Sequence, residues 1–100
     1  MDNDKTEGED LYEGTADPKH REILDQGVEA WNRWRVENPA LQPNLAFEDL
    51  REKDLQEAHL DRADLKGAHL EGADLRGAHL ESADLRGAHL ESADRGVGAV

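Results

Sequence analysis

The chain has 100 residues, the length of one small domain. Twenty-four Asp and Glu against twelve Lys and Arg give a net charge of −12, which disfavours direct binding to nucleic acid phosphates or anionic lipid. Because cysteine is absent, disulfides, thiolate metal sites and a cysteine nucleophile are excluded. No long apolar run and no signal-peptide pattern is visible, so we expect a cytoplasmic protein that does not contact a membrane.

The first element is an acidic segment, residues 1–16. Residues 1–17 carry seven acidic side chains and one lysine, a net charge of −6, and only Leu11 and Tyr12 are large and apolar. Such a segment cannot bury enough apolar surface to offset its ordering entropy, so we predict a disordered tail. Its role as a solubilising tail or as a partner-binding peptide stays open.

A single helix is predicted over residues 17–38. Asp17 followed by Pro18 is a helix start signal, and Asn38 before Pro39 is a stop signal. Apolar side chains recur at three- and four-residue spacing along one face: Ile23, Leu24, Val28, Trp31 and Trp34. Gly27 lies on that face and either weakens the helix or permits a close backbone approach.

An internal repeat of five residues dominates the rest of the chain. Leucine occupies ten successive fifth positions, namely Leu45, Leu50, Leu55, Leu60, Leu65, Leu70, Leu75, Leu80, Leu85 and Leu90. Alanine stands two residues before each leucine from Ala58 to Ala88, and again at Ala93. A period of five fits neither a helix nor a flat strand, but it suits a chain that turns a corner every fifth residue, with alanine and leucine pointing inward. Gly or Ser often stands where the bend is expected.

The run from Ala63 to Gly77, Ala-Asp-Leu-Lys-Gly, Ala-His-Leu-Glu-Gly, Ala-Asp-Leu-Arg-Gly, resembles the pentapeptide-repeat family. The resemblance covers residues 43–94, and residues 27–39 are similar to the helix that precedes the repeats in many bacterial members. It implies a mainly β fold, a right-handed quadrilateral β-helix of about two and a half coils over residues 43–95, with an N-terminal α-helix. Residues 96–100 are expected to be disordered.

The helix is predicted to cover the open N-terminal end of the leucine column through Trp31, Trp34 and Phe47. The repeat pattern frays nearby, because Glu48 and Lys53 occupy inward slots meant for small residues, where a bare charge is costly to bury. We expect the first coil to splay there, or the two charges to pair at its rim. At the other end Arg95 replaces the next leucine, which leaves a coil edge open to pairing with a second copy.

The surface has a period of ten, because histidine and aspartate alternate before the leucines. With four sides to a coil, His59 should stack on His79 and His69 on His89. One interpretation is a solvated, charge-balanced surface without a specific function. The other is that these four histidines are weak metal ligands or form a pH-sensitive strip.

No catalytic constellation is recognisable, and no catalytic residue or cofactor is predicted. The leading interpretation is a small structural or protein-interaction module whose partner is a protein of unknown identity, with a homodimer through the C-terminal coil end left open. The resemblance also implies an alternative, an acidic mimic of DNA that binds DNA gyrase or another DNA-binding protein. The short rod and the location of half of the excess charge in the tail oppose this alternative.

Overall fold

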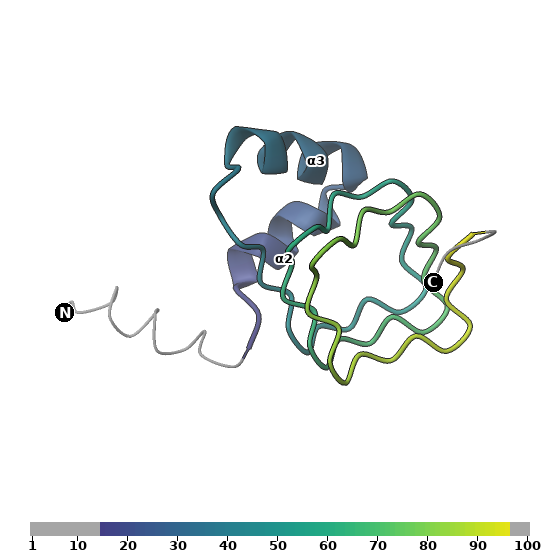
Figure 1. Cartoon of the computed structure of the whole chain (residues 1–100). Helices are drawn as coiled ribbons and strands as arrows, with labels where there is room; N and C mark the ends of the chain where they lie inside the picture. Colours follow the sequence, from purple (N-terminus) through teal and green to yellow (C-terminus); the bar gives the residue numbers. More distant parts are fainter. Residues whose placement is uncertain (1–14, 97–100) are drawn as a thin grey trace.

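The structure, a computed structural model, describes residues 15–96. Helix α2 spans Pro18–Asp25 and helix α3 spans Val28–Glu37, after which the chain winds through successive four-cornered turns (Figure 1). Most of the predicted tail and most of residues 96–100 lie outside the described residues. Of the residues assigned to the tail, Ala16 is described and is buried against the folded part.

The helical segment begins and ends where the sequence indicates, but it is divided in two. The Asp17 carboxylate accepts a hydrogen bond from the Lys19 N–H, with proline in the first turn of α2, and α3 ends at Asn38. The prediction of one continuous helix is wrong, because Gly27 adopts a φ of 109° between α2 and α3. Glycine alone adopts this conformation cheaply, so it turns the chain and starts a second helix.

Parallel backbone bridges hold the coil together. Each bridge joins a residue to the one twenty positions later, and the bridges follow one another every five residues: Asn44–Asp64, Asp49–His69, Asp54–Asp74, His59–His79, Asp64–Asp84, His69–His89 and Asp74–Asp94. Twenty residues and four bridges therefore make one turn of the coil. Within residues 15–96 the bridges stay isolated and do not extend into strands. The expected mainly β class is therefore not confirmed by the secondary structure of these residues.

Every corner of the coil has the same backbone conformation. A positive φ of 62–72° recurs at every fifth residue from Phe47 to Ser92. Hydrogen bonds such as Glu48 N–H to Leu45 C=O close a turn around each corner, and a positive φ at its third residue is typical of type II turns. The Asp side chains of the repeat accept from the N–H two residues later, as Asp64 does from Lys66, and so reinforce the approach to the corner.

The leucine column fills the interior of the coil. The leucines from Leu45 to Leu75 are at most 2% exposed, and the alanines beside them from Ala58 to Ala73 are fully buried. Leu24 of α2 and Trp31 of α3 join the same cluster. Leu80, Leu85 and Leu90 are only partly buried, so the core is closed at the helical end and open at the other.

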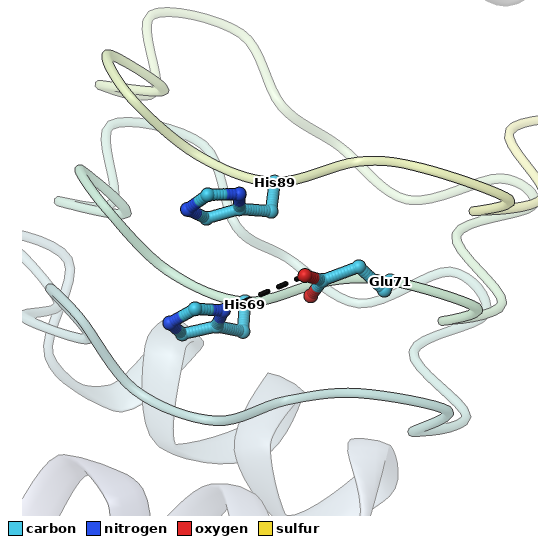
Figure 2. A group of neighbouring side chains, drawn as sticks. All are labelled: His69, Glu71 and His89. Atoms are coloured by element: carbon cyan, nitrogen blue, oxygen red, sulfur yellow. Dashed lines mark ion pairs between the residues drawn. The ribbon is translucent and has the colours of Figure 1, made fainter.

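Outward side chains stack in columns along the coil, as the period of ten predicts. The rings of His69 and His89 lie one above the other, 4.6 Å apart and nearly parallel (Figure 2). The rings of His59 and His79 are 5.0 Å apart but nearly perpendicular. Neither α2 nor α3, nor any other described segment, forms a helix long and apolar enough to cross a bilayer.

Candidate functional site: the two ends of the coil

The first turn of the coil would leave a row of backbone groups unpaired at its N-terminal edge, and α2 supplies partners on the side of Asn44. The Asn44 N–H donates to Nδ1 of His20 at 2.9 Å, and the Asn44 carbonyl accepts from the Asp17 N–H at 3.1 Å. His20 is in turn held between the Asp17 carboxylate and the ring of Trp34. This side is therefore capped by groups that replace a neighbouring coil.

Helix α3 caps the side of His59 in the same way. The Asn32 side-chain amide accepts from the His59 N–H at 2.8 Å and donates to the Glu57 carbonyl at 3.0 Å, as an edge strand would. The indole N–H of Trp31 donates to the His59 carbonyl, and Arg35 donates to the carbonyls of both His59 and Asp61. Arg35 is only 5% exposed, so its guanidinium is buried between α3 and the coil as part of the cap.

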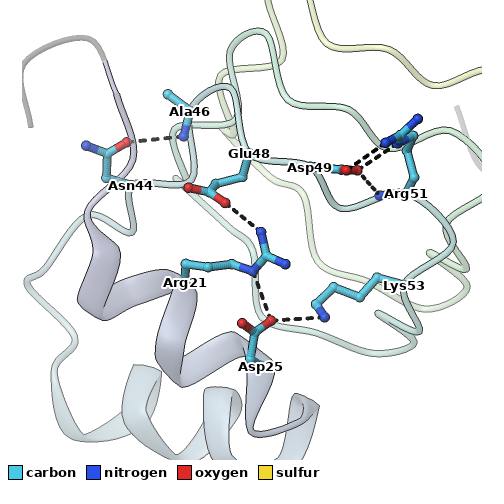
Figure 3. Close-up of polar contacts among 8 residues, drawn as sticks. All are labelled: Arg21, Asp25, Asn44, Ala46, Glu48, Asp49, Arg51 and Lys53. Carbon is cyan, nitrogen blue, oxygen red and sulfur yellow. Dashed lines mark hydrogen bonds and ion pairs between the residues drawn. The ribbon is translucent and has the colours of Figure 1, made fainter.

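On the remaining two sides, Glu48 and Lys53 form ion pairs with side chains of α2 (Figure 3). Arg21 bridges the carboxylates of Asp25 and Glu48, and the Lys53 ammonium lies 3.1 Å from Asp25. The prediction that these charges splay the coil or pair with each other is wrong. Their side chains point instead toward Arg21 and Asp25, the opposite charges that α2 presents (Figure 3).

The predicted cap residues differ in where they lie. Trp31 is fully buried, and Trp34 is partly buried with its ring 5.1 Å from that of Trp31. Phe47 was predicted to share this position, which is wrong, because it is 55% exposed. It stands at a corner with positive φ, so its ring points outward and lies over the corner at Gly67.

In the part of the chain that the structure describes, the opposite end of the coil presents the same edge without backbone partners. In the earlier turns, N–H groups such as that of Leu60 donate to the next turn, and carbonyls such as that of Ala58 accept from it. Within residues 15–96 the equivalent groups of the last turn have no backbone partner, namely the N–H groups of Leu80, Ser82, Leu85, Gly87, Leu90 and Ser92 and the carbonyls of Ala78, Ala83 and Ala88. This edge, unpaired within the described residues, and its three partly buried leucines form a surface that we call the open edge.

The coil carries an excess of negative charge, with thirteen acidic and seven basic side chains over residues 43–96. Some of its aspartates are paired with a cation two residues later: both Asp84 oxygens accept from Arg86, which lowers the pKa of Asp84 to about 2, and Asp49 and Asp74 are held likewise by Arg51 and Arg76. Carboxylates neutralised in this way do not imitate a row of free phosphates. The pairing opposes the DNA-mimic alternative at these three positions, and that alternative stays a prediction.

The predicted metal candidates form two separate pairs. The groups His69, Glu71 and His89 come together on one side, with their ligand atoms within 4.8 Å of one another. On the opposite side, the carboxylate equivalent to Glu71 is that of Asp61, which lies near Arg35 and Arg62. Glu81 lies 3.9 Å from Nδ1 of His79. Within the described residues, however, only the pair of His69 and His89 has a carboxylate, that of Glu71, close to both rings.

Sequence reasoning missed three capping residues, His20, Asn32 and Arg35. The spacing of Trp31 and Arg35, four residues apart on one helical face, could have indicated that both reach the coil. The roles of His20 and Asn32 depend on which backbone groups the first turn leaves unpaired. No sequence signal marks those groups.

Comparison with known families gives a match to part of the chain. Residues 54–91 match the family model described as pentapeptide repeats, in eight copies. This stretch is thus a pentapeptide-repeat region, which confirms the resemblance found in the sequence. Searches of curated proteins and of solved structures gave no match for the chain.

Proposed function

We propose that the chain is a non-enzymatic, cytoplasmic protein-interaction module whose binding surface is the open edge, and that its first partner is a second copy of itself. The observation that carries the proposal is the row of N–H and C=O groups that have no backbone partner among residues 15–96, flanked by Leu80, Leu85 and Leu90. Unpaired edges of this kind are templates for pairing with another chain. The Leu and Ala side chains that fill the interior leave no room for a substrate there, which supports a role other than catalysis.

We further infer that residues 43–95 form the right-handed quadrilateral β-helix typical of pentapeptide repeats. The twenty-residue register of the bridges, the corner every fifth residue and the buried leucine column support this. In such a coil both edges have the same hydrogen-bonding pattern. The cap occupies one of them, so association through the coil ends stops at a dimer instead of continuing as a filament.

The open edge can pair with its own copy. A two-fold axis perpendicular to the coil axis sets the last turns of two copies antiparallel. We place that axis through the corner between the side of His79 and the side of Asp84. The Leu80 N–H of one copy then meets the Ala83 carbonyl of the other, and the Leu85 N–H meets the Ala78 carbonyl. The same arrangement sets the side of His79 against the side of Asp84, so unlike residues face each other across the interface.

Sedimentation equilibrium from micromolar to near-millimolar concentration tests the proposal on the unmodified chain. We expect a monomer–dimer equilibrium that Leu85→Lys shifts to monomer, because an inward-pointing lysine blunts an edge. The matched control is Gln56→Lys, which adds the same charge at an exposed position on the side of the first turn and should leave the dimer intact. Circular dichroism shows whether each variant is folded.

A chain that stays monomeric throughout that range contradicts the proposal. A dimer that Gln56→Lys breaks and Leu85→Lys leaves unchanged would place the interface on the flat sides of the coil. That result also overturns the open edge as the binding surface.

A further inference from the structure

We infer that His69, Glu71 and His89 form a binding site for a divalent transition metal such as Zn²⁺, linking two successive turns of the coil. The three side chains leave the same side of the coil, with His89 one turn beyond His69 and Glu71 two residues after it (Figure 2). Their ligand atoms already lie within 4.8 Å of one another. Two imidazoles and a carboxylate are a donor set that holds Zn²⁺ with a water in the fourth position.

Glu71 is poised for this role by the lack of a competing partner. One of its carboxylate oxygens, Oε1, is buried and accepts no hydrogen bond within residues 15–96. The other oxygen lies 3.5 Å from Nδ1 of His69. A buried acceptor without a partner is costly, and a bound cation would remove that cost.

The neighbouring cations and anions do not occupy the site. Lys66 and Arg86 border the hollow beside the two rings, but each is drawn to an aspartate two residues before it. Asp49, directly below His69 in the same column, has both oxygens engaged by Arg51. The free ligands are therefore those of the second and third turns.

A modest movement of the rings completes the geometry. Ligands at about 2.0–2.1 Å from a tetrahedral zinc lie about 3.4 Å from one another, so the present separations must close by roughly 1 Å. The parallel rings must also tilt, because each nitrogen lone pair lies in the plane of its ring. His89 is exposed and His69 is nearly half exposed, so both rings can rotate without disturbing the core.

The other histidine pair is an internal control. His59 and His79 are also one turn apart, but Asp61 beside His59 is drawn to Arg35 and Arg62. In addition, Asn32, Trp31 and Arg35 fix the backbone of His59. Glu81 lies 3.9 Å from Nδ1 of His79, but within the described residues only His69, Glu71 and His89 bring three ligand atoms together, so the pair of His59 and His79 should bind Zn²⁺ more weakly.

Titration of the full chain with Zn²⁺ alone, followed by the side-chain ¹⁵N resonances of all five histidines, tests the inference. We expect His69 and His89 to shift together and saturate at one equivalent, before His59 and His79 respond. Calorimetry should show that Glu71→Gln weakens binding by about tenfold. The matched control Glu81→Gln, at the same repeat position two sides further on, should leave the affinity unchanged.

The variants concern side chains on the outside of the coil, and amide spectra show whether each variant keeps the native fold. Absence of any histidine shift overturns the inference, as does an equal response of the two pairs. Equal zinc affinity in Glu71→Gln and the unmodified chain would also overturn it, because the position of the Glu71 carboxylate close to both rings is what distinguishes this pair.

Discussion

The two ends of the coil are built from the same repeat, yet they differ in how their edges are satisfied. At the N-terminal end, α2 and α3 supply hydrogen-bond partners for the sides of Asn44 and His59 and opposite charges for Glu48 and Lys53. At the other end the corresponding groups of residues 78–92 have no backbone partner within the described part of the chain, and the leucines are only partly buried. The difference shows that the repeat forms the turns of the coil but does not supply hydrogen-bond partners for its terminal edges. Those partners come from residues outside the repeat.

The largest expected effect compares one leucine at each end. Leu50→Ala should lower the free energy of unfolding by about 2–5 kcal/mol, because Leu50 is 1% exposed and its loss leaves a cavity. Leu90→Ala at the open edge should cost less than half as much, since solvent already reaches it. Urea denaturation measures both, and equal losses would show that the two ends are equally closed.

The cap itself is tested by Arg35→Met. This substitution keeps most of the packing but leaves the carbonyls of His59 and Asp61 without the guanidinium, so it should cost about 2–3 kcal/mol. Arg33→Met, on the exposed side of α3, is the matched control and should change stability by no more than about 0.5 kcal/mol. If the two variants unfold at the same urea concentration, the guanidinium is not part of the cap.

A smaller difference is expected between two corners. Gly67→Ala and Gly87→Ala both place a side chain at positive φ, at a cost of about 1–2 kcal/mol. Only at Gly67 would the new Cβ meet the ring of Phe47, at 2.3 Å, whereas the corner at Gly87 has space. Gly67→Ala should therefore lower the melting temperature further, and a lower melting temperature for Gly87→Ala would contradict this packing.

The smallest effect is a pH dependence that the cap creates. Burial lowers the pKa of His20, although Asp17 acts in the opposite direction. The unfolded chain therefore takes up the proton first, and the contribution of His20 to stability is complete above its ordinary pKa of about 6.5 and declines as the pH falls below it. Protonation of Nδ1 would also remove the acceptor for the Asn44 N–H.

Denaturation at pH 7.5 and 5.5 measures this effect. The unmodified chain should lose more stability between the two values than His20→Gln does, because the other titrating groups are common to both. An equal loss of stability in the two proteins would mean that the pKa of His20 is the same in the folded and unfolded states.

The repeat made the coil predictable, because a single local rule recurs along it. The leucine spacing indicated the inward column, and the alternation of histidine and aspartate indicated which residues stack. The start of α2 at Pro18 and the end of α3 before Pro39 followed from proline chemistry alone. These features depend on near neighbours or on a fixed register of twenty residues.

The rest depends on contacts between the helices and the coil. Gly27 lies on the apolar face of the predicted helix, and only the need for α3 to reach the side of His59 makes it a turn. Glu48 and Lys53 looked like defects of the repeat until α2 brought Arg21 and Asp25 opposite them. Phe47 looked like a cap residue because it is large, but the five-residue register places it at an outward corner.

Amide hydrogen exchange of the unmodified chain, followed by NMR at low and high protein concentration, tests the difference between the capped and the open end of the coil most directly. In dilute solution the N–H groups of Asn44 and His59 should be protected by the cap, while those of Leu80, Leu85 and Leu90 exchange rapidly. Raising the concentration should slow exchange at the last three alone. Two results would contradict the account. One is protection of the N–H groups at both ends of the coil in dilute solution, and the other is an exchange rate at the open edge that does not change with protein concentration.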